Sequence, residues 1–176
     1  YYFHKDDNVI TNKEEVCGDF EKLINLQLKE KHPKSWMRAF FNMGLINYIE
    51  GSRRMLPCQA GEMNFFVEPY GDIYPCNGLE KKYWKKRMGN IRETPNFKEI
   101  WEGEQAEQVR QMVRRCPKNC WMVGTASPVM HKYIKYPLKW ALKNKLRSLQ
   151  GKTACLDKCW YNVGQDPSQG DLREVF

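Results

Sequence analysis

The pattern of hydrophobic and polar positions predicts helices at both ends of the chain and a short hairpin between them. The first helix starts at Thr11 or Asn12 and runs towards Glu30, with acidic residues in its first turn that complement the helix dipole. Its predicted buried stripe consists of Val16, Phe20, Leu23, Ile24 and Leu28. After the break at His32-Pro33, a second apolar helix is predicted from Trp36 to about Glu50.

The middle of the chain has the features of a β-hairpin. Phe65–Val67 and Ile73-Tyr74 are strand formers, and Tyr70-Gly71-Asp72 between them is a turn signal. Gly89–Ile91 is predicted to add a short third strand. We therefore expect a small antiparallel sheet.

Two helices are predicted to follow the sheet. Thr94-Pro95 is a helix start, with Thr as the cap, and Phe97, Ile100 and Trp101 are expected on its buried side. Gly103 separates this helix from one over residues 104–115. The stripe of the latter is Ala106, Val109 and Val113.

The last predicted element begins at Ser127-Pro128 and continues as a long basic helix from Lys132 to Leu149. Its expected buried residues are Ile134, Leu138, Ala141, Leu142 and Leu146. A basic amphipathic helix can lie on an acidic membrane surface or dock on the protein with its lysines in solvent, and we favour the docked helix.

These elements together predict an α+β fold with a small antiparallel hairpin sheet and flanking helices. We divide the chain into a helical lead-in over 1–57, a cysteine-bearing domain over 58–125, the basic helix over 126–150 and a polar tail over 151–176.

Composition narrows the class of protein. The chain has 176 residues, 41% of them hydrophobic, which supplies material for a core. It has no apolar run of about 18 residues and does not begin with a signal peptide, so we expect it in the cytoplasm.

The net charge of +8 is spread over several elements without a nucleic-acid-binding motif, so we do not expect nucleic acid as a partner. Neither a Ser/His/Asp arrangement nor a phosphate-binding glycine loop is present.

The cysteines are the candidate metal ligands of this chain. Cys58 and Cys76 flank the predicted hairpin, and Cys116 and Cys120 follow the helix over 104–115. Four soft sulfur ligands from two separate elements suit a metal centre. An iron–sulfur cluster, a zinc ion and disulfides all remain open on spacing alone, although structural zinc sites usually have two close pairs.

The spacing of Cys58, Gly71 and Cys76, followed by a distant close pair of cysteines, resembles the auxiliary-cluster domain of radical S-adenosylmethionine enzymes. That domain is called SPASM in its two-cluster form and twitch in its one-cluster form. The resemblance extends from about Tyr2 to Asn144 and includes Met88–Ile91 and Cys120–Gly124. The close pair departs from the pattern, because three residues separate its cysteines where twitch domains often have two.

The resemblance implies that Cys58, Cys76, Cys116 and Cys120 hold one auxiliary [4Fe–4S] cluster, used for electron transfer or for shaping a substrate pocket. The implied partners are an upstream barrel that binds S-adenosylmethionine, a peptide or small-molecule substrate, and an external electron donor. The family's cysteine triplet that cleaves S-adenosylmethionine is absent, because its third position holds Val123 after Cys116 and Cys120 and Asn162 after Cys155 and Cys159. The alternative is a zinc-stabilised interaction module.

Three further cysteines form a candidate second cluster site. Cys155 and Cys159 repeat the spacing of Cys116 and Cys120, and Cys17 is the remaining thiol. Cys17 lies beside the stripe of the first helix, where a lone cysteine is more often a small buried hydrophobe than a ligand.

Overall fold

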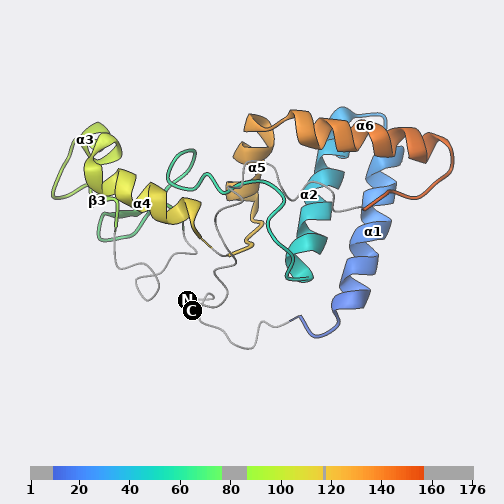
Figure 1. Cartoon of the computed structure of the whole chain (residues 1–176), viewed down its shortest axis with the longest axis horizontal. Helices are drawn as coiled ribbons and strands as arrows, with labels where there is room; N and C mark the ends of the chain where they lie inside the picture. The colour runs from blue at the N-terminus through green and yellow to red at the C-terminus, as the bar shows by residue number, and fades with distance from the viewer. Residues whose placement is uncertain (1–9, 77–86, 117, 157–176) are drawn as a thin grey trace. The chain divides into compact units, whose positions relative to one another are not determined.

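The computed structural model describes residues 10–76, 87–116 and 118–156 and divides the chain into two compact units. The first unit combines Tyr1–Leu56 with Lys118–Pro167, and the second combines Pro57–Pro117 with Ser168–Phe176. Helices and one three-stranded antiparallel sheet confirm the α+β class (Figure 1). Most of the predicted polar tail, beyond residue 156, lies outside the described residues. No helix in the described ranges is long and apolar enough to cross a bilayer.

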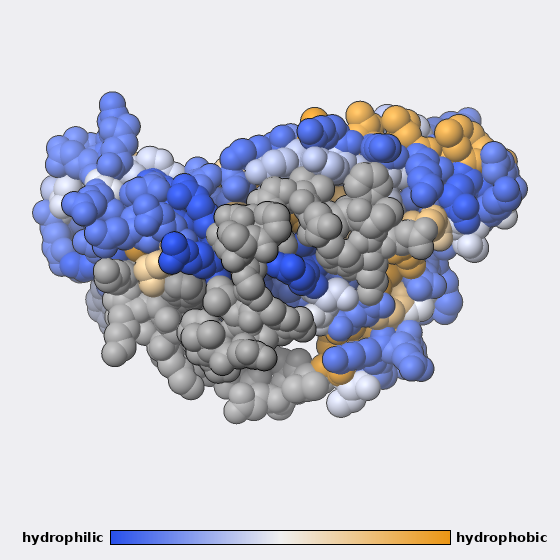
Figure 2. Space-filling model, viewed as in Figure 1, coloured by the Kyte–Doolittle hydropathy of each residue, from blue (hydrophilic) through white to orange (hydrophobic). Residues whose placement is uncertain are grey.

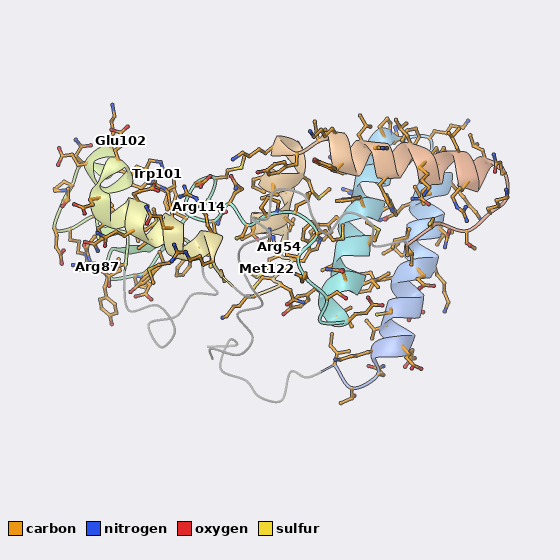
Figure 3. All side chains as sticks on the ribbon, in the orientation of Figure 1. Arg54, Arg87, Trp101, Glu102, Arg114 and Met122 are labelled. Carbon is orange, nitrogen blue, oxygen red and sulfur yellow. The ribbon has the colours of Figure 1, made fainter. Side chains whose placement is uncertain are left out.

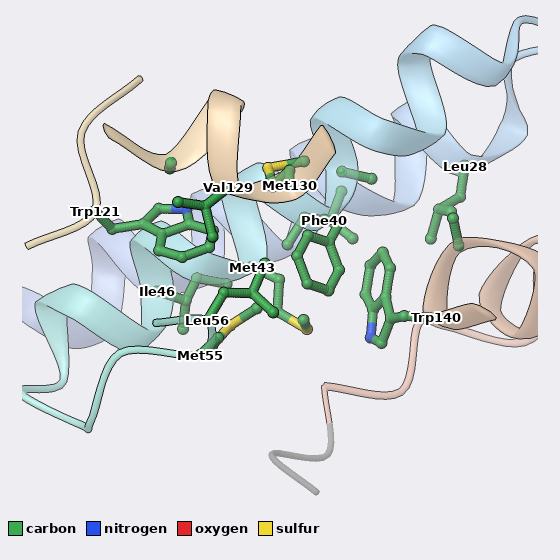
Figure 4. Close-up of a cluster of buried hydrophobic side chains, with 14 residues drawn as sticks. Leu28, Phe40, Met43, Ile46, Met55, Leu56, Trp121, Val129, Met130 and Trp140 are labelled. Carbon is green, nitrogen blue, oxygen red and sulfur yellow. The ribbon is translucent and has the colours of Figure 1, made fainter. Parts of the chain in front are cut away.

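The first unit is helical. It contains α1 (Lys13–Lys29), α2 (Pro33–Ile49), α5 (Val123–Lys132) and α6 (Lys135–Leu149), and α1, α2 and α6 pack against one another. Their shared core is built around large apolar side chains from all four helices and from the segments beside α2 and α5 (Figure 4). Phe40 lies edge-on to Trp140, with 5.6 Å between ring centroids, so aromatic packing joins α2 to α6.

The first two helices follow the prediction with two corrections. Ile24 and Leu28 are buried as expected, whereas Leu23 is exposed because α2 and α6 cover only part of the predicted stripe. Helix α2 begins at Pro33 rather than near Trp36. Proline is tolerated in the first turn, where its missing N–H has no intrahelical partner to lose.

The predicted long C-terminal element is two helices, and its start was predicted wrongly. Thr125 and Ala126 already donate their backbone N–H groups to the Met122 carbonyl, so α5 forms before Ser127 and contains Pro128. A break at Tyr133 and Ile134 then separates α5 from α6.

The face that α6 buries was also predicted wrongly, apart from Ala141. The buried residues are Pro137, Trp140, Ala141 and Asn144. Asn144 is accommodated because its amide donates to the Trp140 carbonyl and accepts from the Cys155 N–H. The other four residues of the stripe predicted for the core are instead exposed: Ile134, Leu138, Leu142 and Leu146.

The second unit contains the predicted sheet. Strands β1 (Phe66–Val67), β2 (Asp72–Tyr74) and β3 (Gly89–Asn90) pair antiparallel in the order β1-β2-β3, with Val67 opposite Ile73 and Ile73 opposite Gly89. Gly71 adopts a φ of 90° at the turn, a conformation that glycine accepts without strain. The hairpin and its third strand are therefore confirmed.

Helices α3 (Phe97–Glu102) and α4 (Glu104–Arg114) pack against each other and share a core with β2. The cap of α3 is Asn96 rather than Thr94, because the Asn96 side chain accepts the Lys98 N–H at 3.1 Å. Phe97 is exposed, so only part of the predicted buried side is buried. The small core of this unit consists of Ile73, Met88, Ile100, Ala106 and Val109.

Candidate metal centre

Three of the four predicted ligands converge in the second unit. Cys58, Cys76 and Cys116 are partly buried and pack against the same two buried residues, Ala60 and Val113. Cys76 lies two residues after the end of β2, and Cys116 follows the last turn of α4, where its N–H donates to the Val113 carbonyl at 3.0 Å. Segments far apart in the sequence thus bring three thiols to one small apolar cluster.

A side-chain hydrogen bond from Asn64 joins the two cysteine-bearing loops. Within the loop that carries Cys58, the Gly61 N–H donates to the Asn64 carbonyl at 2.8 Å. The Asn64 side chain then donates through Nδ2 to the carbonyl of Pro75, one residue before Cys76, at 3.2 Å. Gly61 has a φ of 78°, and a Cβ at this position would lie 3.0 Å from the Cβ of Pro75. A glycine is therefore needed where the loop that carries Cys58 approaches the end of the hairpin.

Helix α4 is tied to the same loop by arginines. Arg110 donates through Nε to the Gly61 carbonyl at 2.8 Å, and its guanidinium lies 4.8 Å from the Trp101 ring centroid. Arg114 pairs with Glu62 at 3.0 Å and with Glu107 at 3.1 Å (Figure 3). The hydrogen bond from Arg114 lowers the pKa of Glu107. The exposed ion pairs add little stability, so Arg110 is the stronger link to α4.

The fourth predicted ligand, Cys120, belongs to the first unit. Its carbonyl accepts a hydrogen bond from the guanidinium of Arg54, which also donates to Leu56 O at 2.9 Å and Thr125 O at 3.1 Å. Arg54 lies beside the segment that carries Met122 (Figure 3). Its guanidinium carbon is 5.3 Å from the ring centroid of Trp121. The backbone around Cys120 is therefore held in place.

The charge of Arg54 has no carboxylate partner among the residues that the structure describes. Its side chain is 6% exposed and its three hydrogen-bond acceptors are all neutral carbonyl oxygens. A buried cation without a counter-charge is costly, and an anionic group nearby would offset that cost. Sequence reasoning missed Arg54, because no motif marks it and its contacts include residues 120 and 125, far away in the chain.

The thiols themselves are not arranged as a finished site. No disulfide joins the six cysteines of the described ranges. Within those ranges, no group of three or more His, Cys, Asp or Glu side chains is placed to hold a metal ion. The structure therefore brings three predicted ligands into one neighbourhood, and ligation by all four stays a prediction.

The candidate second site also stays a prediction. Cys17 packs against the core of the first unit, as expected for a small hydrophobe. Cys155 donates its N–H to Asn144 Oδ1 at 2.6 Å, and its carbonyl accepts from Trp140 Nε1 at 3.2 Å. Cys159 lies outside the described residues. The two described cysteines, Cys17 and Cys155, belong to the same unit.

Residues 58–122 match the family model of SPASM, an iron–sulfur cluster-binding domain. The matched range begins at Cys58 and includes all four predicted ligands. No curated protein and no solved structure matches the chain. The match indicates that residues 58–122 are an iron–sulfur cluster-binding region.

Proposed function

We propose that Cys58, Cys76, Cys116 and Cys120 bind one auxiliary [4Fe–4S] cluster, and that the chain is the auxiliary-cluster portion of a radical S-adenosylmethionine enzyme. The observation that carries this proposal is the family match over residues 58–122, in which the structure gathers three of the four cysteines around Ala60 and Val113. The proposed partners are an upstream S-adenosylmethionine-binding barrel, a peptide or small-molecule substrate and an external electron donor.

The residues present fit such a cluster. Thiolates are the usual ligands of iron–sulfur clusters, and the loops that carry Cys58 and Cys76 are already connected through Asn64. The uncompensated cation of Arg54, which donates to the Cys120 carbonyl, suits an anionic group.

When bound, the cluster supplies one-electron transfer at a potential set by its surroundings. Four cysteine thiolates fill the coordination positions of the iron, which favours electron transfer or support of a substrate pocket over direct binding of substrate. Trp121, 3% exposed, limits access of water to the backbone beside Cys120. Arg54 adds positive charge there, which favours the more negative, reduced form of a nearby cluster.

Anaerobic purification followed by iron and sulfide analysis tests the proposal. We expect a brown protein with about four iron and four sulfide per chain. Replacement of Cys76 or Cys116 by Ser removes one thiolate and is expected to lower the iron content sharply. Cys17→Ser is the matched control, because Cys17 is also half-buried but outside the ligand set.

Two results would contradict the proposal. A colourless protein with one zinc per chain would indicate the zinc-stabilised module, because zinc also accepts four thiolates. Iron content unaffected by Cys76→Ser and Cys116→Ser, but lost in Cys17→Ser, would place the cluster at the other cysteines.

A further inference from the structure

Helix α6 carries an exposed row of aliphatic side chains that the core of the first unit does not use. The row consists of Ile134, just before the helix, and of leucines whose exposed fractions range from 43% for Leu138 to 71% for Leu149. Leu142 and Leu146 lie between them, and the spacing of four residues keeps Leu138, Leu142 and Leu146 on one side of the helix. We call Ile134, Leu138, Leu142, Leu146 and Leu149 the leucine stripe. Figure 2 shows hydrophobic surface over the part of the molecule where α6 lies.

The leucine stripe is exposed because a different side of α6 packs into the core. The opposite side of α6 packs against α1 and α2 through Trp140, Ala141 and Asn144, which are at most 2% exposed. Lys145 reinforces this docking by donating to the carbonyls of Leu28, Lys29 and Glu30 at 2.8–3.1 Å. The face formed by Trp140, Ala141 and Asn144 therefore determines the orientation of α6, and the leucine stripe faces solvent.

A row of lysines runs beside the stripe. Lys135, Lys139 and Lys143 are exposed, and each follows a stripe residue by one position, which places them about 100° further round the helix. From Val123 to Leu156 the sequence contains seven Lys or Arg and no Asp or Glu. The exposed half of α6 thus joins an aliphatic strip to a strip of positive charge.

We infer that this half of α6 lies on an anionic lipid surface, with the leucine stripe in the boundary between headgroups and acyl chains and with Lys135 and Lys143 at the phosphates. The stripe spans about 22 Å of helix, which suits a helix lying in the plane of the interface. Charge complementarity favours anionic lipid as the binding partner of this surface, because anionic headgroups attract the lysine row while the acyl chains accept the leucines.

A protein partner fits this surface less well. The centres of protein interfaces are enriched in Trp, Tyr and Arg and depleted of Lys, and leucine is under-represented among the residues that dominate binding energy. The stripe is purely aliphatic and its exposed neighbours are lysines. This inference concerns a surface without any of the proposed cluster ligands, so it does not depend on the proposed function.

Sedimentation with lipid vesicles tests the inference. We expect the full chain to bind vesicles of phosphatidylcholine mixed with phosphatidylglycerol, to bind phosphatidylcholine alone at least tenfold more weakly, and to be released by added salt. Leu142→Ser combined with Leu146→Ser is expected to weaken binding to the mixed vesicles at least tenfold, because two leucines no longer insert. Lys135→Gln combined with Lys143→Gln is expected to weaken it on the order of tenfold and to reduce the salt dependence.

Leu26→Ser is the matched control, because Leu26 on α1 is 59% exposed and Leu146 is 61% exposed. This variant should bind like the parent chain, and circular dichroism should show that every variant remains helical. Failure of the parent chain to bind anionic vesicles, or equal binding by the leucine double variant, would overturn the inference. A dimer in sedimentation velocity that the leucine double variant abolishes would instead assign the stripe to a second copy of the chain.

Discussion

Gly44 on α2 lies against the indole of Trp121, the residue that follows Cys120. A Cβ at position 44 would overlap the indole ring. The indole N–H donates to the Phe41 carbonyl at 2.8 Å, one turn earlier on the same helix, and the ring is 6.3 Å from that of Phe41. A glycine in α2 therefore makes room for the tryptophan that anchors the backbone next to a proposed cluster ligand.

Gly44→Ala is expected to destabilise the protein by about 3 kcal/mol, because the indole must leave its place and the gain in helix propensity does not compensate. Chemical denaturation followed by tryptophan fluorescence measures this change. Gly18→Ala is the control, because nothing lies within 4 Å of a Cβ there, and it should stabilise α1 by about 0.5–1 kcal/mol. Equal stability of the two variants would show that Trp121 does not depend on Gly44.

Arg54→Gln is expected to lower the free energy of unfolding by about 2 kcal/mol, because buried carbonyls lose charged hydrogen-bond donors. The neighbouring Arg53 is exposed, and Arg53→Gln should change stability by less than about 0.5 kcal/mol. In the iron-loaded protein, Arg54→Gln should also lower the reduction potential in a titration monitored by electron paramagnetic resonance. An unchanged potential would mean that the Arg54 charge does not act on the cluster.

Removal of iron with a chelator should loosen the second unit more than the helices of the first. Ligation would cross-link the loops around Cys58 and Cys76 to the end of α4, so it should add most of their order. Hydrogen–deuterium exchange with mass spectrometry should show faster exchange after chelation over 58–76 and 113–120, and little change over α1 and α2. Loosening confined to peptides around Cys17 and Cys155 would point to the candidate second site instead.

Alkaline pH should weaken the protein partly through Tyr74. Burial raises the pKa of Tyr74, and the negative charges of Glu68 and Asp72 raise it further. The folded state therefore holds the phenolic proton more tightly than the unfolded state does. The resulting stability is complete below the unfolded pKa of about 10 and is lost as the pH rises towards the higher folded value.

Tyr74→Phe should accordingly reduce the decline of the unfolding free energy above about pH 10, measured by urea denaturation across a pH series. Tyr70→Phe, at a position 74% exposed, should leave the decline as it is in the parent chain. Identical alkaline behaviour of the parent chain and Tyr74→Phe would rule out Tyr74 as a source of the effect.

Local signals in the sequence predicted much of the second unit. The turn at Gly71 and the strand formers beside it are encoded within a few residues, and the hairpin formed where they placed it. The stripe of Ala106, Val109 and Val113 on α4 was also predicted correctly, because those residues are the only apolar row on a very polar helix. The N-cap of α3 was predicted wrongly. Asn96 and Thr94 are both residue types that cap helices well, and the choice between them depends on where the chain leaves β3.

Periodicity by itself determined that the C-terminal segment is helical, that it is amphipathic and that cysteines sit beside two predicted elements. Only the tertiary structure decided that α6 buries Trp140 and Asn144 and leaves its leucines outside, because burial depends on which surfaces α1 and α2 present. It also decided that Cys58, Cys76 and Cys116 share one apolar cluster and that Arg54 is buried at the Cys120 carbonyl. The spacing of the cysteines indicated that they converge, but not which buried residues surround them or which cation lies at the Cys120 carbonyl, since those contacts are set by packing between segments far apart in the chain.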